Sequence, residues 1–408
     1  MNITPMPLFR RRSDSLSLWF SVYSLKIMRQ HNYNKDFEFV KEPIEFNKYT
    51  ERDTLQYCLG ATLYMPGTKD IREKIVNHDL PVTSFVMCCE DAIKEEDLPK
   101  AEENILDTMD FFADEIEAGR LTHDDIPLIF VRVRNPEQFK SFAARITKKQ
   151  ASVLTGFNFP KFNSKNALGV LRTLVEVNSR LGVILYGMPI LEGPEVAFVE
   201  SRNQELLLLR NILEPYKDLI LNIRVGGTDM SSLFGVRRGI NSTVFDIMPV
   251  RDALSDIVNF FNRYCDYCIS AAVWEYFRAY NDDDIDELIK RNFHNALVKG
   301  QDIVNPAIDG LLKEVMIDRA NGFVGKTIIH PTHAKFVNAM FTVVEEEYND
   351  AVQILNTSGG VIKSEGGGKM NEIGPHHRWA EKIVKRAQVY GVVKSEDSVL
   401  GLVLGHKE

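Results

Sequence analysis

Two neighbouring stretches, VILYGMPILE at residues 183–192 and LILNIRVGGTD at residues 219–229, decide the fold. Each is a short, largely apolar run that ends in an acidic residue, Glu192 in the first and Asp229 in the second. Neither run alternates strictly between apolar and polar residues, which is typical of strands buried on both faces. An amphipathic segment separates them. The pair therefore predicts a strand–helix–strand unit of a parallel sheet.

The same pattern recurs along the chain and predicts eight strands separated by helices. A closed (β/α)₈ TIM barrel of the α/β class accommodates this alternation. The rival architecture is an open doubly wound sheet, but no candidate strand is followed by a GxGxxG or P-loop motif. The candidate strands are Ala61–Met65, Pro81–Cys89, Pro127–Val133, Gly156–Phe159, Val183–Leu191, Leu219–Gly227, Cys268–Trp274 and Gly325–His330. The expected helices include Leu98–Ala118, Asn166–Arg180, Arg202–Leu213 and Val250–Cys265.

Three regions follow from this pattern. We expect the barrel to occupy residues 56–345, between an N-terminal extension (residues 1–55) and a C-terminal arm (residues 346–408). Asn281–Lys299 interrupts the rhythm and reads as an insertion after the seventh strand. The arm combines the glycine-rich stretch Ser358–Gly368 with a final helix. We expect this arm to lie over a neighbouring subunit of a homo-oligomer.

Composition narrows the class of partner and the compartment. The formal net charge of -8 argues against an obligate nucleic-acid partner, although a local cationic pocket can still bind a small anionic substrate. The five cysteines show no disulfide framework, and Cys265 and Cys268 have no second pair to complete a zinc site. We interpret this pair as core residues and expect a cytoplasmic protein. No run has the roughly 18 apolar residues that a membrane span needs.

Acidic residues at two consecutive strand ends predict a metal site. Neighbouring strands lie about 4.8 Å apart, so the carboxylates of Glu192 and Asp229 can reach one point above the barrel. Two hard oxygen ligands, with the remaining positions left to water and substrate, favour Mg²⁺. Gly227 and Thr228 precede Asp229, and a glycine there lets the backbone approach a ligand. The competing interpretation makes both carboxylates solvated loop residues.

Other charged residues lie where strands end. Arg132 interrupts an otherwise apolar strand, and a buried arginine needs an anion. That anion is either an internal carboxylate such as Glu90 or a carboxylate or enolate of the substrate, which a guanidinium can grip with two hydrogen bonds. Asp91 and Lys161 end further strands, Lys69 and Arg72 follow the first, and His330 ends the last with a catalytic or a structural role.

These strand ends, taken in order, resemble the HpcH/HpaI aldolase and citrate lyase β-subunit family. The segment from Tyr64 to Gly67 is similar to the family's FVPG, and that from Glu90 to Ile93 to the end of DLEDAV. The remaining matches are Val131–Arg134 with VRVN, Phe159–Lys161 with LPK, Ile190–Gly193 with an IET-type turn, Gly227–Gly235 with FGxxDLxxxLG and Gly322–Pro331 with GFDGKxxIHP. The resemblance covers residues 60 to about 395.

This resemblance implies Mg²⁺-dependent retro-aldol or retro-Claisen cleavage, or the reverse condensation, of a 3-hydroxyacyl-CoA such as citryl-CoA or malyl-CoA. It assigns the metal to Glu192 and Asp229, the enolate or carboxylate to Arg132, and the orientation of that arginine to Glu90 or Asp91. Lys69, Arg72, Lys161, Gly227 and Thr228 become candidate substrate-binding residues.

Two departures from the family pattern and two alternatives bear on the substrate. Cys88 stands where the family has the first aspartate of DLED, and Lys69 stands where it has an arginine. The chain thus resembles a divergent branch, such as the barrel lyases that accompany tellurite-resistance operons. One alternative is a class II aldolase that acts on free pyruvate-like hydroxy-oxo acids, and the other is a catalytically inactive barrel subunit.

Overall fold

The computed structural model describes residues 28–277, 304–364 and 368–404. Within these residues, parallel strands form one sheet in the order β7-β6-β5-β4-β3-β2-β1-β8. An isolated parallel bridge between Ala271 and Lys326 joins its two edges and closes the barrel. The strands are β1 (Ala61–Pro66), β2 (Ser84–Cys88), β3 (Leu128–Arg132), β4 (Leu154–Phe159), β5 (Tyr186–Leu191), β6 (Ile223–Val225), β7 (Ile269–Ser270) and β8 (Lys326–Ile328). Each of the eight predicted strands is confirmed.

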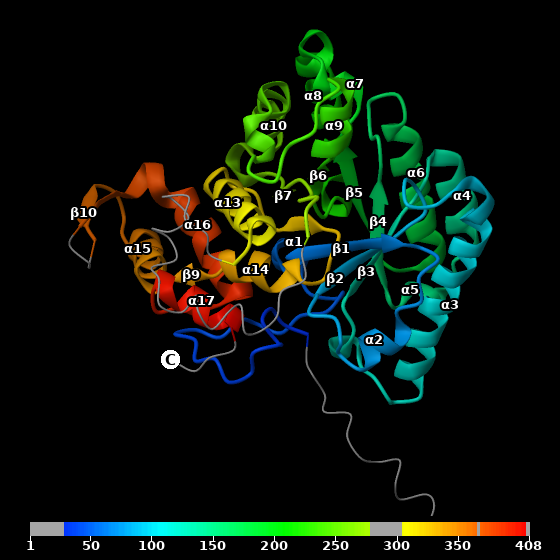
Figure 1. The fold of residues 1–408 in the computed structure, drawn as a ribbon, viewed down its shortest axis with the longest axis horizontal. Coiled ribbons are helices and arrows are strands. Elements are labelled where there is room, and N and C mark those ends of the chain that lie inside the picture. Colours follow the sequence, from blue (N-terminus) through cyan, green and yellow to red (C-terminus); the bar gives the residue numbers. More distant parts are fainter. Residues whose placement is uncertain (1–27, 278–303, 365–367, 405–408) are drawn as a thin grey trace, which may run out of the picture.

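Helices surround the barrel, and their apolar faces pack on the strands (Figure 1). In α3 (Leu98–Glu117), for example, Ile105, Met109 and Phe112 are fully buried. The other helices of this ring are α2 (Arg72–Val76), α4 (Pro136–Arg145), α5 (Lys148–Ala151), α6 (Ala167–Leu181), α7 (Pro194–Ala197), α8 (Val199–Leu213), α9 (Gly227–Leu233), α10 (Met248–Phe261), α13 (Pro306–Ala320) and α14 (His333–Met340). No helix of the described ranges is long and apolar enough to cross a membrane.

One predicted helix is shorter than expected. The segment Val250–Cys265 was predicted as a single helix, but α10 ends at Phe261. A 3₁₀ turn follows, in which Tyr264 and Cys265 have φ values of 55° and 61°. Non-glycine residues adopt this left-handed region rarely, so the helix cannot continue through it. The apolar periodicity continues into the turn, which explains the overestimate.

The C-terminal region packs on the N-terminal segment of the same chain, to the side of the barrel in Figure 1. It contains β9 (Val343–Val344), α15 (Glu345–Leu355), β10 (Val361–Lys363), β11 (Met370–Glu372), α16 (Ile373–Tyr390), β12 (Val392–Val393) and α17 (Glu396–Leu404). Strand β12 pairs with β9 and forms a bridge with Lys41. The side chain of Asn34 donates to the backbone oxygen of Leu402 over 3.0 Å. The glycine-rich stretch contains β10 of an antiparallel hairpin. The predicted insertion Asn281–Lys299 lies outside the described residues.

A buried ion-pair cluster fixes α13 against β8. Lys326 is fully buried, and its Nζ lies 2.8 Å from Glu314 Oε1 and 2.7 Å from Asp318 Oδ2. Glu314 Oε2 also contacts Arg238 Nη1 at 2.6 Å. Burial raises the pKa of Asp318 to about 7. Lys326 and Arg238 are both paired with carboxylates, so we interpret this cluster, on the outer side of β8, as structural.

Candidate active site

The carboxyl ends of the strands surround a cavity of about 480 Å³. Residues from the ends of most strands line it, as the barrel architecture requires of an active site. The charged residues of its lining are Asp91, Arg132, Glu192, Arg224, Asp229 and Glu275. Opposite charges from separate strands and βα loops therefore lie together in this cavity.

Arg132 lies at the centre of an ion-pair cluster. The pairing of β2, β3 and β4 places it opposite Cys88 and Asn158. Its Nη2 lies 2.8 Å from Glu90 Oε2 and 3.3 Å from Glu192 Oε1, and its Nη1 lies 3.2 Å from Asp91 Oδ2. Burial alone would lower the pKa of Arg132, but Glu192 and the other nearby acidic groups raise it above its usual value. The guanidinium stays charged and holds the carboxylates in place.

Lys161 follows β4 and contacts the same carboxylates. Its backbone has a φ of 48°, and its N–H donates to Glu192 Oε1 over 2.9 Å. Its Nζ lies 2.5 Å from Glu90 Oε1 and 3.5 Å from Asp91 Oδ1. Partial burial would lower the pKa of Lys161, but the hydrogen bond to Glu90 and the acidic neighbours raise it. Lys161 thus positions Glu192 through its backbone and Glu90 through its side chain.

Glu90 and Asp91 form a carboxyl pair beside Arg132. Burial and a hydrogen bond with Asp91 raise the pKa of Glu90, against the opposing effect of Arg132. Partial burial would raise the pKa of Asp91, but its hydrogen bond with Glu90 and the charge of Arg132 lower it. The two carboxyls therefore differ in acidity, and Asp91 is the one that faces the cavity.

Glu192 and Asp229 both line the cavity, and the two carboxylates lie near enough to interact electrostatically. Glu192 is 3% exposed, and a Cβ built on Gly226 would lie 2.2 Å from its Oε2. The carboxylate thus lies against the backbone just before α9, whose first turn carries Asp229. Burial raises the pKa of Glu192 to about 7, Arg132 opposes this shift, and the charge of Asp229 adds to it. Gly226 is required here because any side chain would displace Glu192.

The two carboxylates fit a hard cation. Among the residues that the structure describes, neither Glu192 Oε2 nor the Asp229 carboxylate accepts a hydrogen bond or ion pair. No group of three or more His, Cys, Asp or Glu side chains in these ranges is arranged to hold a metal. A pair of carboxylates matches Mg²⁺, which retains several waters and is commonly held by one or two protein carboxylates. A closed structural zinc site would need more ligands.

Of the other residues predicted to bind substrate, only Thr228 lines this cavity among the described residues. Thr228 lines the cavity and donates to Glu275 Oε1 over 2.5 Å, whereas Gly227 lines an adjacent hollow. Neither Lys69 nor Arg72 lines the cavity in the described part of the chain. Arg72 instead pairs with Asp70 at the surface, where its Nη2 lies 2.5 Å from Oδ2.

Sequence reasoning missed three residues that the cavity contains: Tyr64, Arg224 and Glu275. Arg224 interrupts an apolar strand, the same signal that identified Arg132. Glu275 directly follows the predicted seventh strand, so it met the criterion applied to the other strand ends. Tyr64 lies within the quoted family motif but carries no charge to mark it.

His330 ends the last strand but does not line the cavity. Its ring stacks on Phe277 at a centroid distance of 4.7 Å, and its Nδ1 lies 2.7 Å from Thr332 Oγ1. Partial burial and the charge of Lys69 lower its pKa. These contacts favour the structural role that the sequence left open.

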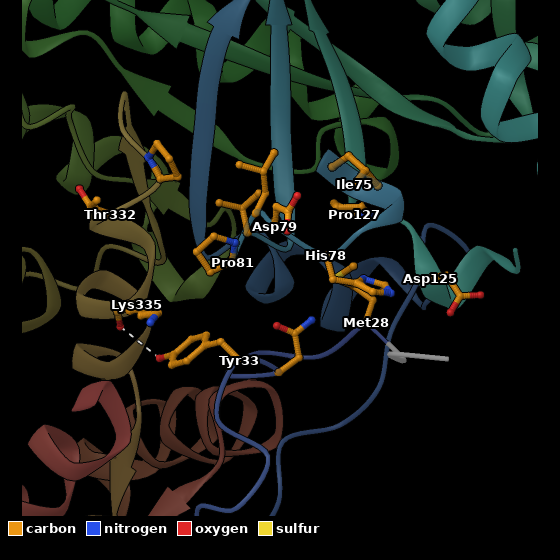
Figure 2. A pocket seen from close by; sticks show the side chains of 14 residues that line it. Met28, Tyr33, Ile75, His78, Asp79, Pro81, Asp125, Pro127, Thr332 and Lys335 are labelled. Carbon is orange, nitrogen blue, oxygen red and sulfur yellow. Dashed lines mark hydrogen bonds between the residues drawn. The ribbon is translucent and has the colours of Figure 1, made fainter. Parts of the chain in front are cut away.

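A second cavity of about 400 Å³ lies at the opposite end of the barrel (Figure 2). Pro81 and Pro127, which precede β2 and β3, face Met28 and Lys335 across it. Tyr33 donates to the backbone oxygen of Lys335 over 3.4 Å at its edge. This end of the barrel holds the amino termini of the strands. Residues at this end of a TIM barrel contribute to stability, whereas active sites lie at the carboxyl end, so this cavity is not the candidate active site.

Two solved structures are similar to this chain at low sequence identity. No curated protein matches the sequence. A protein CitE from Mycobacterium tuberculosis, solved with magnesium, acetoacetate and coenzyme A, is 17% identical, with a TM-score of 0.48 over 81% of this chain and 99% of that chain. A malate synthase from Haloferax volcanii is 13% identical, with a TM-score of 0.48 over 81% of this chain and 87% of that chain.

The model of a family described as C–C bond lyases of the TIM-barrel fold matches residues 53–392. This range begins in α1 (Arg52–Cys58), includes every strand of the barrel, and ends at β12. The match confirms both the predicted barrel and the predicted carbon–carbon lyase class. The chain therefore belongs to the TIM-barrel family of C–C bond lyases.

Proposed function

We propose that this lyase cleaves a 3-hydroxyacyl-CoA thioester of the citryl-CoA or malyl-CoA type, by a Mg²⁺-dependent retro-aldol or retro-Claisen reaction. The observation that carries the proposal is the pair Glu192 and Asp229, whose unpaired carboxylate oxygens lie beside one cavity together with Arg132. The resemblance to the motifs of the citrate lyase β-subunit family supports a CoA thioester as the substrate. Membership of the C–C bond lyase family supports cleavage of a carbon–carbon bond.

Each residue has a part in this chemistry. Glu192 and Asp229 would hold Mg²⁺, which polarises the oxygen atoms of the oxo-acid half when bound. Arg132 is preorganised by its carboxylate partners and is placed to stabilise the enolate that remains after bond cleavage. Asp91 faces the cavity and is the candidate acceptor of the proton from the substrate hydroxyl, which it can share with Glu90.

A substrate panel tests the proposal. The purified protein is incubated with citryl-CoA, malyl-CoA and free hydroxy-oxo acids, in Mg²⁺ or in EDTA, and the released oxo acid is measured. We expect cleavage of a thioester that requires Mg²⁺ and is lost in Glu192→Gln and Asp229→Asn. Turnover of only the free acids would replace the thioester with an aldolase substrate. Absence of Mg²⁺ binding by calorimetry, with both variants behaving like the wild type, would identify an inactive barrel.

A further inference from the structure

Arg224 differs from every other buried arginine that the structure describes. The buried arginines are Arg132, Arg202, Arg224 and Arg238. Arg132 has its carboxylate cluster, Arg202 lies 3.0 Å from Asp256, and Arg238 lies 2.6 Å from Glu314. Arg224 is 1% exposed, and no carboxylate of the described residues pairs with it. An arginine stays protonated in proteins, so this is a bare cation inside the barrel.

The contacts of Arg224 are weak substitutes for an anion. Its Nη2 donates to Thr327 Oγ1 over 2.6 Å, and its Nη1 lies 3.5 Å from Thr62 Oγ1. Its Nε has no hydrogen-bond partner in the described part of the chain. Its guanidinium also hydrogen-bonds with the side chain of Tyr64 and lies 5.4 Å from the ring centre of that residue. Burial raises the pKa of Tyr64, so the phenol stays neutral and does not balance the charge.

Arg224 lies in the wall of the active-site cavity. Strand β6 places it beside Ile190 of β5, two residues before the metal-binding Glu192, and both Arg224 and its partner Thr327 line the cavity. A ligand in that cavity can therefore reach the guanidinium. The hydroxyls of Thr62, Thr327 and Tyr64 occupy only part of the donor positions of the guanidinium, and the remaining ones, Nε among them, are free for a planar, two-oxygen acceptor.

We propose that Arg224 binds a second carboxylate of the substrate, at a subsite deeper than the metal. The inference rests on the proposed function for the first carboxylate, which would lie at Glu192 and Asp229. It specifies the oxo-acid half of the substrate: this half carries a carboxylate at each end, and a substrate with a methyl group at the far end binds poorly.

A matched pair of ligands isolates this contact. Oxaloacetate and 2-oxobutyrate share the 2-oxo acid that would reach the metal and differ in a carboxylate or a methyl group at the far end. We expect calorimetry to show that the wild type binds oxaloacetate at least tenfold more tightly. In Arg224→Met this preference should fall to about one. A wild-type preference near one, or an Arg224→Met variant that retains it, would overturn the proposal.

Two further variants control for folding. Arg202→Met also removes a buried arginine, but it should keep the ligand preference and lose thermal stability, because it leaves Asp256 without its partner. Arg224→Met should melt no lower than the wild type, because no carboxylate loses a partner. Should Arg224→Met not fold, Arg224→Lys retains a cation without the two-pronged geometry. Its preference should fall at least threefold, and an unchanged preference would contradict the paired contact.

Repeating the titrations in EDTA separates this inference from the proposed function. Loss of the metal weakens both ligands alike, so the preference for oxaloacetate should persist. A persistent preference together with Mg²⁺-independent turnover would reject the metal site and retain the Arg224 subsite. Mg²⁺-dependent cleavage without any preference would do the reverse.

Discussion

Replacement of Glu192 by glutamine separates a functional carboxylate from a structural one. Glutamine has the same shape and can still accept the N–H of Lys161, a contact of 2.9 Å in the wild type. Only the charge is removed. Burial raises the pKa of Glu192 from 4.5 to about 7, with Arg132 opposing and Asp229 adding to this shift. Each unit corresponds to about 1.4 kcal/mol, so ionised Glu192 costs the metal-free folded state on the order of 3 kcal/mol.

The sign of the pH dependence follows from the raised pKa. The folded protein binds this proton more tightly than the unfolded chain, so the associated stability is present below pH 4.5 and lost as the pH rises to about 7. Glutamine never ionises and avoids the loss. In EDTA, Glu192→Gln should therefore melt a few degrees above the wild type at pH 8 and close to it at pH 5.

Mg²⁺ should reverse this order. A bound ion stabilises the wild type by mass action, whereas the variant has lost one of two anionic ligands and should bind Mg²⁺ about 100-fold more weakly. Scanning calorimetry at pH 5 and pH 8, with Mg²⁺ or EDTA, measures both effects. The control is Glu275→Gln, which removes another carboxylate of the cavity, one already paired with Thr228. A Glu192→Gln variant that melts well below the wild type at pH 8 in EDTA would refute the reasoning.

Three further substitutions test the surroundings of the site. Arg132→Met removes the buried guanidinium that Glu90, Asp91 and Glu192 share and leaves only Lys161 beside them, and we expect a loss of about 3–5 kcal/mol in urea unfolding together with nearly all activity; a loss under about 1 kcal/mol would contradict the pairing. Lys326→Met leaves the buried Asp318 without a cation and Glu314 with Arg238 alone, and it should cost a similar amount, whereas Lys313→Met on the exposed face of that helix should be nearly neutral in the same measurement. Gly226→Ala places a Cβ 2.2 Å from Oε2 of Glu192, the proposed metal ligand, and should abolish Mg²⁺ binding by calorimetry, whereas Gly239→Ala, in open space, should not; equal affinities in the two alanine variants would argue against the proposed ligand.

The barrel was predictable because its strands are buried on both faces. That burial requires continuous apolar runs, and the amphipathic helices between them, such as α3, follow from the same core. The local break at Tyr264 and Cys265 was not predictable, because the apolar periodicity runs through it. Neither was the packing of β12 against β9 and Lys41, which depends on contacts between distant parts of the chain.

The candidate site was predictable where a charge ends an apolar run. Glu192, Asp229 and Arg132 were found in this way, and the structure brings them to one cavity. Functional residues in loops were harder to predict, because the sequence indicates that a residue lies in a loop but not where its side chain points. Arg72 illustrates this, because its charge is satisfied by Asp70 at the surface.

Arg224 and Glu192 are two buried residues of the cavity whose charges are unfavourable in the free protein. They extend from adjacent strands into one cavity, yet they do not pair with each other in the described residues. Burial raises the pKa of the carboxylate and lowers that of the guanidinium, so each charge is costly in the free protein. A barrel that served only as a scaffold would be more stable with apolar residues at both positions. A ligand set of a divalent cation and a dicarboxylate offsets both costs at once, which is the physical reason to seek a substrate with two anionic ends.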